Sequence, residues 1–338
     1  MPTPKAHVCM PARDDPSSNP PAPSQHSEPQ PSLEELLDTR HDPAYGEAVQ
    51  VARLVQRVTA ANASPFTFAG TGTYIVGGRR VAVIDPGPDD AGHTEALLQA
   101  LEGRTVTHIC ITHTHSDHSP ASRALAEATG APVLGFGPHP AADAGRDSAK
   151  GSAGQEEPGD WDFAPDGVLG HGDEVDGDGW TLKCLHTPGH ISNHLCFALP
   201  EERAIFTGDH VMGWSSTIIP PPDGNLGDYL RSLDLLIARG DRDEVYLPTH
   251  GPPITTPNRY ARALLAHRHR RTDQILACLR EGPTTIPAMV ARMYTTTPEV
   301  LHPAAALSVL AHLIHLAEEG KVTRDPTADM RAATYALA

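Results

Sequence analysis

The sequence predicts an α/β protein with a helical carboxyl-terminal part. Short apolar, β-branched runs recur between residues 81 and 247, and each ends in a polar loop beside glycine or proline. From Tyr260 onwards the apolar residues follow a helical spacing instead. We therefore expect three segments: a disordered one at 1–45, a strand-containing domain at 46–257 and a helical domain at 258–338.

Each predicted strand is followed by a histidine or aspartate, the residue types that commonly bind metal ions. The predicted strands are 81–84, 106–111, 180–186, 204–206 and 244–247, and the residues that follow them are Asp85, His113, His190, Asp209 and His250. Neighbouring glycine and proline residues allow the backbone to turn sharply at these points. Loops at strand ends can direct several side chains toward one place, so we expect one site built from distant parts of the chain.

The segment Thr112–His118 carries the strongest chemical signal. It contains His113, His115, Asp117 and His118, whereas a lone histidine among the 20 in the chain is more often a surface or core residue. Mixed imidazole and carboxylate ligands suit Zn²⁺ best, with Mn²⁺ or Fe as alternatives. His113 and His115 alternate to one side, and Asp117 and His118 can reach a second ion roughly 3.5–4 Å away. The pattern predicts two metal ions per chain.

These motifs resemble those of the metallo-β-lactamase fold superfamily, and within it the branch called β-lactamase-like protein 2. The superfamily resemblance rests on Val83-Ile84-Asp85-Pro86-Gly87, the histidine segment, Thr187-Pro188-Gly189-His190, Gly208-Asp209 and His250-Gly251-Pro252. The branch resemblance rests on the tail, at His267-Arg268, Arg271, Gln274-Ile275-Leu276 and Thr297-Pro298-Glu299-Val300-Leu301-His302. Together they cover roughly Val58 to Val322.

The resemblance implies an αββα sandwich with the metals at one edge, followed by a small winged-helix-like domain. The first ion is then held by His113, His115 and His190, the second by Asp117, His118 and His250, and Asp209 bridges the two. A hydroxide between the ions is the expected nucleophile, with Asp117 as a catalytic ligand. The sequence agrees, because it contains no Gly-x-Ser-x-Gly elbow for covalent catalysis.

Other residues near the motifs carry weaker signals. Asp85 is expected either to orient a ligand histidine or to cap its loop. His194, four residues after His190, is expected to donate a proton to an oxyanion or leaving group, with simple packing as the alternative. The family places two glycines soon after the histidine segment, whereas this chain has Ser119-Pro120-Ala121, which we expect to narrow the pocket.

Composition limits the setting of the protein. The first 32 residues are rich in proline and poor in bulky apolar residues, which predicts disorder. We expect a cytoplasmic protein with no membrane partner, because we see no signal peptide and no 18-residue apolar run. The five cysteines are scattered without a Cys-x-x-Cys, so buried reduced thiols are expected. The stretch 141–167 is either a flap over the site or a surface excursion.

Helices and a hairpin are predicted for the tail. Tyr260–Leu279, Thr285–Tyr294 and Pro303–Glu319 have helical patterns, and Gly320 follows the third as a stop. Leu307, Leu310, Ile314 and Ala317 form its expected apolar stripe. The runs 321–324 and 331–335 are expected to pair, which completes a winged helix. The chain has a net charge of −16, yet 258–324 is weakly basic, which suits a nucleic-acid, docking or homodimer interface equally.

Three classes of function remain open from the sequence. The first is metal-dependent hydrolysis of a small ester, thioester or lactone. The second is endonucleolytic cleavage of single-stranded RNA, which the family resemblance implies. The third is a non-catalytic interaction protein on the same fold, which retention of all seven ligand positions disfavours.

Overall fold

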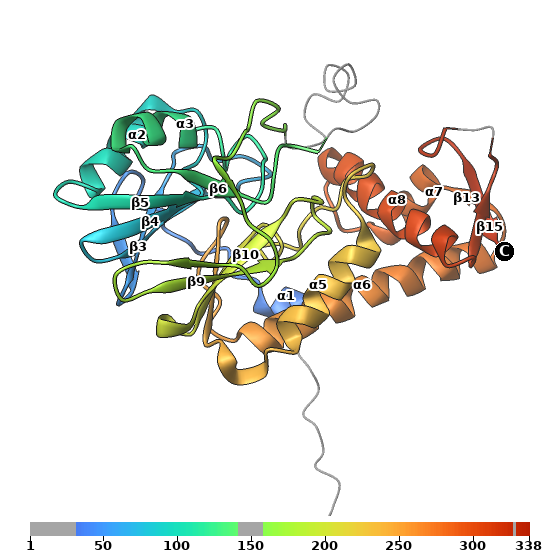
Figure 1. Cartoon of the computed structure of the whole chain (residues 1–338). Helices are drawn as coiled ribbons and strands as arrows, with labels where there is room; N and C mark the ends of the chain where they lie inside the picture. The colour runs from blue at the N-terminus through green and yellow to red at the C-terminus, as the bar shows by residue number, and fades with distance from the viewer. Residues whose placement is uncertain (1–31, 141–157, 327–328) are drawn as a thin grey trace, which may run out of the picture. The chain divides into compact units, whose positions relative to one another are not determined.

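The computed structural model describes residues 32–140, 158–326 and 329–338. Two sheets and the helices that cover them form the larger part of this region (Figure 1). The first sheet has the order β1 to β7: Val49–Ala52, Val55–Thr59, Gly72–Gly77, Arg80–Ile84, Thr105–Cys110, Val133–Gly135 and Gly167–Val168. The second has the order β12 to β8, from Val245–Pro248 through Ala204–Gly208, Leu195–Leu199 and Thr181–His186 to Glu174–Asp176.

Alternation of side chains along the strands produces four layers. In β3, Tyr74 and Val76 face an apolar core between the two sheets, which also contains Trp180 and Phe206. Ile75 of the same strand faces the opposite way, toward α2 (Ala91–Ala100) and α3 (Ser122–Thr129). The second sheet is covered on its outer face by α1 (Leu33–Leu36), α5 (Leu226–Ile237) and the first half of α6 (Pro257–Arg280). The expected αββα sandwich is confirmed.

The winged helix follows as predicted. It contains α7 (Ile286–Met293), α8 (His302–Glu318) and a three-stranded sheet of β13 (Thr284–Thr285), β15 (Thr334–Leu337) and β14 (Val322–Arg324). Its core combines the second half of α6 with α7 and α8. The expected stripe on α8 is confirmed at Leu307 and Leu310, which are buried, but it is wrong at Ala317, which is exposed. Val309, Leu313 and Leu316 complete the buried face.

Two expectations about the chain ends and membranes need correction. Residues 32–45 are not wholly irregular, since α1 packs Leu33, 2% exposed, into the core beside α6; residues 1–31 lie outside the described part.

The window Glu299–Glu318 is long and apolar enough to span a membrane, contrary to the expectation that no such run exists. Of this window 44% is buried inside the protein, and Val309, Leu310 and Leu313 pack into the winged-helix core.

The remaining expectations concern cysteines and the insertion. Cys110, Cys184, Cys196 and Cys278 are buried and free, as predicted, whereas Cys9 lies outside the described residues. Of the stretch 141–167, the structure describes only the end from 158. There Phe163 is 3% exposed and packs into the core behind α3, so it does not serve as an apolar surface over the site.

Candidate metal centre

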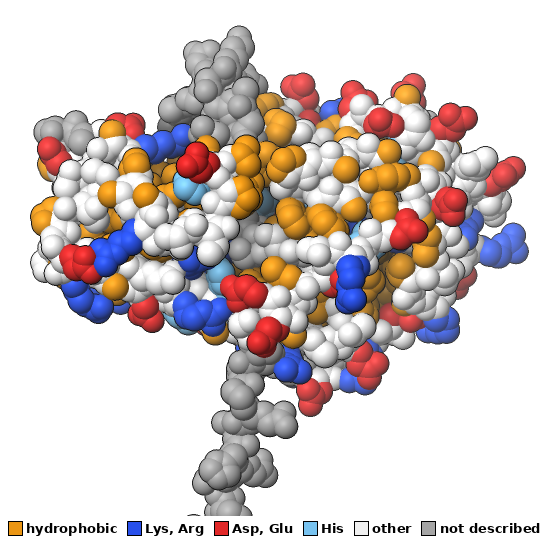
Figure 2. Space-filling view, turned by 180° about the vertical axis from the view of Figure 1, so that it is seen from behind, with side chains coloured by type: hydrophobic (Ala, Val, Ile, Leu, Met, Phe, Trp, Pro, Cys, Tyr) orange, Lys and Arg blue, Asp and Glu red, His pale blue; other side chains and the backbone are white. Residues whose placement is uncertain are grey.

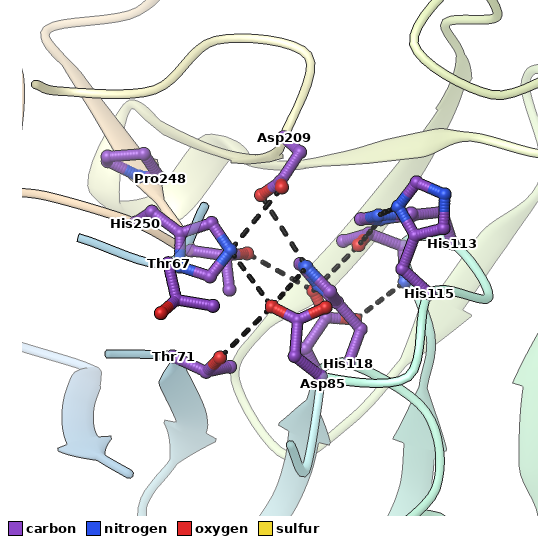
Figure 3. Close-up of polar contacts among 12 residues, drawn as sticks. Thr67, Thr71, Asp85, His113, His115, His118, Asp209, Pro248 and His250 are labelled. Carbon is purple, nitrogen blue, oxygen red and sulfur yellow. Dashed lines mark hydrogen bonds and ion pairs between the residues drawn. The ribbon is translucent and has the colours of Figure 1, made fainter. Parts of the chain in front are cut away.

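All seven predicted ligands meet at one edge of the sandwich, in the loops that follow β5, β9, β11 and β12. Figure 3 shows His113, His115, His118, Asp209 and His250 among them. They form three overlapping groups of potential ligands, which are His113, His115 and His190; His113, His118 and Asp209; and Asp117, His118 and His250. Asp117 is the most exposed of the seven, at 8%. The structure thus brings together residues that span most of the hydrolase domain.

Three imidazole nitrogens converge in the first group. His115 Nδ1 lies 3.0 Å from His113 Nε2 and 3.1 Å from His190 Nε2. Burial and neighbouring histidines hold the pKa of His113 well below its usual value. Burial also lowers the pKa of His115 to about 4. Neutral imidazoles at this spacing offer three nitrogen lone pairs to one ion.

A carboxylate joins two imidazoles in the third group, which contains Asp117, His118 and His250. Asp117 Oδ2 lies 3.1 Å from His250 Nε2 and 3.4 Å from His118 Nε2. Burial alone would lower the pKa of both histidines, but the nearby carboxylates outweigh it. They raise the pKa of His118 well above its usual value and that of His250 to about 10. The carboxylates therefore favour positive charge at this position.

Asp209, which belongs to the second group, lies between the first and the third. Its Oδ1 is 3.6 Å from His118 Nε2, and its Oδ2 is 3.3 Å from His250 Nε2 and 4.0 Å from His190 Nε2. The pKa of Asp209 is well below its usual value, because His250 and His118 outweigh the effect of burial. A permanently ionised carboxylate between two ligand groups can bridge two cations.

Several buried atoms at the centre lack a hydrogen bond within the described part of the chain, namely Asp117 Oδ1, His118 Nε2, Asp209 Oδ1 and His250 Nε2. The two imidazole nitrogens have only ion-pair contacts with the carboxylates. Buried polar atoms are almost always satisfied, so four orphans facing one another point to a missing ligand. Imidazole nitrogens and carboxylate oxygens are the donors that Zn²⁺ prefers, and they also accept Mn²⁺ or Fe. The residues therefore fit a pair of metal ions.

The outward nitrogens of the ligand histidines are held by fixed partners. His118 Nδ1 lies 2.9 Å from Asp85 Oδ2, which confirms the expected orienting contact. His190 Nδ1 lies 2.6 Å from the Ile218 carbonyl, and His250 Nδ1 lies 3.2 Å from the Gly70 carbonyl. A proton donated to each of these oxygens leaves Nε2 free to bind metal. The protein thus selects the ligand tautomer through its backbone and Asp85.

The structure does not support the donor role expected for His194. Its side chain is fully buried, and Nε2 accepts from the backbone N–H groups of Asp209 and His210 at 3.2 and 3.3 Å. A backbone N–H can only donate, so Nε2 carries no proton for an oxyanion. His194 Nδ1 is 2.9 Å from Thr187 Oγ1. The His194 side chain therefore stabilises the loop that carries Asp209.

Sequence reasoning missed the polar residues that hold the loops. Arg57, only 4% exposed, donates to the carbonyls of Gly251 at 2.6 Å and Thr249 at 3.0 Å. Thr71 Oγ1 lies 3.2 Å from Asp117 Oδ2. A single arginine or threonine gives no signal in sequence, because its partners lie far along the chain: backbone atoms 194 and 192 residues away for Arg57, and a carboxylate 46 residues away for Thr71.

A pocket of about 470 Å³ of open space adjoins the metal centre. One wall contains the ligands His115, His190 and Asp209. The rest is formed by Pro65, Phe66, Met212, Trp214, Ser215, Ser216, Thr217, Ile218 and Pro220. Ser119, Pro120 and Ala121 do not line this pocket, so the expected narrowing by these residues is not seen.

Comparisons with known proteins agree with this geometry. Residues 67–250 match the model of the metallo-beta-lactamase superfamily, and residues 285–330 match that of the beta-lactamase associated winged helix domain. The beta-lactamase-like protein 2 homolog of Drosophila melanogaster is 32% identical over 294 residues, covering 83% of this chain and 94% of its own. An atrochrysone carboxyl ACP thioesterase of Aspergillus chevalieri is 31% identical over 281 residues, covering 79% and 82%.

A solved structure shows the same arrangement of domains. The beta-lactamase domain protein from Burkholderia ambifaria superposes with a TM-score of 0.73 at 22% identity, covering 91% of this chain and 99% of its own. This similarity concerns the fold, whereas the sequence matches establish the family. With its ligand loops, sandwich and winged helix in place, the chain belongs to the metallo-beta-lactamase superfamily of hydrolases.

Proposed function

We propose that this hydrolase uses two zinc ions to cleave small acyl thioesters. The observation that carries the proposal is the position of the pocket, which places an apolar wall directly beside His115, His190 and Asp209. The name of the Aspergillus chevalieri relative, a thioesterase, supports the same chemistry. When bound, the two ions would supply a hydroxide from water near neutral pH and polarise the substrate carbonyl.

The side chains of the pocket suit an acyl group. Phe66 and Trp214 present aromatic surface, and Phe68 stacks on Trp214 with ring centroids 4.9 Å apart and planes at 13°. This stacking holds the indole of Trp214 in place at the wall of the pocket. An apolar acyl chain can bind against this wall while its carbonyl faces the ligand histidines.

The same pocket is poorly suited to a phosphodiester. Among the described residues its lining contains no lysine or arginine. Figure 2 shows acidic and basic side chains interspersed on one face of the molecule, with apolar side chains between them. Binding of RNA depends on Lys and Arg contacts to phosphates. We therefore favour the thioester over single-stranded RNA as substrate.

A side-by-side assay tests the proposal. Zinc-loaded protein is offered an acyl thioester, the matching oxygen ester, a lactone and a short single-stranded RNA, and the released thiol, acid or RNA fragments are measured. We expect the highest kcat/KM on the thioester and loss of activity after chelation. RNA cleavage at an equal or higher kcat/KM would contradict the proposal.

A further inference from the structure

The tail residues His267, Arg268 and Arg271 belong neither to the candidate metal ligands nor to the lining of the pocket. All three residues lie on α6, but their surroundings differ. Arg271 lies over the ring of Tyr294, with Cζ 4.4 Å from the centroid, and His267 lies 3.5 Å from Glu34. Arg268 is instead 3% exposed and points into the hydrolase domain.

The surroundings of Arg268 do not neutralise its charge. Its Nη2 donates to the carbonyl of Thr217, and Cζ lies 5.1 Å from the ring centroid of Tyr229 on α5. Nε is buried without a hydrogen-bond partner among the described residues. Burial of a cation without a carboxylate is costly, so a role in stability alone is a weak explanation for this residue.

Both residues that Arg268 contacts, Thr217 and Tyr229, pack beside the segment that carries His190, a proposed metal ligand. His190 Nδ1 lies 2.6 Å from the Ile218 carbonyl and 3.2 Å from Thr217 Oγ1. The Thr217–Ile218 segment, to which Arg268 donates, therefore also orients the imidazole. On the other side, Tyr229 supports the turn before His190. A Cβ added at Gly189, where φ is +139°, would lie 2.4 Å from Tyr229 Cα. The backbone of α5 therefore packs directly against this turn.

We infer that Arg268 is a positioning residue that holds His190 in its metal-binding orientation from helix α6. Its guanidinium fixes the Thr217–Ile218 backbone on one side of the imidazole and Tyr229 on the other. Thr217 and Ile218 also line the pocket, so the same contact sets one wall of the substrate site. The inference rests on the proposed metal centre, and it gives the tail a defined role in assembling that centre.

Metal titration of the full-length protein tests this role. Arg268→Met keeps much of the volume of the side chain but removes the donor and the charge. We expect the ion held by His113, His115 and His190 to bind about 10-fold more weakly, as is typical when a group that orients a ligand is lost. The absorption spectrum of the Co²⁺-substituted protein should change, because the imidazole orientation changes. Arg262→Met is the matched control, since Arg262 is exposed on the same helix and donates to Asn258 alone among the residues that the structure describes.

If Arg268→Met does not fold, a second variant tests the same role. Arg268→Lys keeps the positive charge, but one ammonium group cannot both donate to the Thr217 carbonyl and stack on the Tyr229 ring. A smaller loss of metal affinity is therefore expected. Unchanged affinity and an unchanged Co²⁺ spectrum in a folded Arg268 variant would overturn the inference, even if its Tm fell. Absence of metal binding by the unmodified protein would instead reject the proposed metal centre.

Discussion

Asp85→Asn should weaken metal binding by changing the tautomer of one ligand. Asp85 Oδ1 accepts from the Thr112 N–H at 2.7 Å, and Oδ2 lies 2.6 Å from Thr112 Oγ1 and 2.9 Å from His118 Nδ1. Asparagine suits this position sterically, because φ at Asp85 is +49° and asparagine tolerates that region. The backbone N–H of Thr112 cannot accept, so the amide oxygen stays there and the NH₂ group faces His118.

Two donors then face each other, and His118 must move its proton to Nε2 or turn away. Either response removes the lone pair that points at the second metal position. The loss of such an orienting contact weakens metal affinity by about 10- to 100-fold, which corresponds to about 1.4–2.8 kcal/mol. The first ion, held by His113, His115 and His190, should be much less affected.

Two-step metal titration against a chelator measures this effect, with Asp90→Asn as the control. Asp90 accepts from the His93 N–H at 2.7 Å as the N-cap of α2, and asparagine serves equally well at that position. We expect affinities within twofold of the unmodified protein for this control. Equal second-ion affinity in Asp85→Asn and Asp90→Asn would refute the tautomer argument.

Further predictions concern the bridge, the nucleophile, the pocket and the tail. Asp209→Ala should weaken both ions, because the bridging carboxylate is shared; metal analysis showing loss of only one would contradict this. His118→Ala should lower kcat by orders of magnitude with an unchanged circular dichroism spectrum, and near-normal turnover would exclude the two-metal proposal. Phe66→Ala should raise KM for a long apolar acyl thioester about tenfold, since loss of such a contact is worth roughly 1.5 kcal/mol, with little change for an acetyl thioester. Truncation after Pro257 should abolish two-step metal binding in titration, and preserved binding would show that α6 is dispensable.

The sequence predicted which residues converge at the candidate site, because their signals are local. Histidines and carboxylates that follow predicted strands identify the candidate ligands without knowledge of tertiary contacts, and His190, Asp209 and His250 each lie beside a glycine. His194 shows the limit of this reasoning, because its distance along the chain from His190 says nothing about which atoms its ring nitrogens face. Only the fold places Nε2 against the N–H groups of Asp209 and His210, where it accepts instead of donating.

The expected boundary at 257/258 shows a second limit. It coincides with the start of α6, which begins at Pro257, and a change from strands to helices suggests a separate module there. Yet Tyr260, Ala261 and Leu264 belong to the core beneath the second sheet, while Ile275 and Leu279 belong to the winged helix. One continuous helix therefore contributes to two cores, and helical periodicity cannot reveal which partner each turn contacts. Arg268 lies between these two halves, so the tail is better regarded as a support of the metal centre than as an appendage.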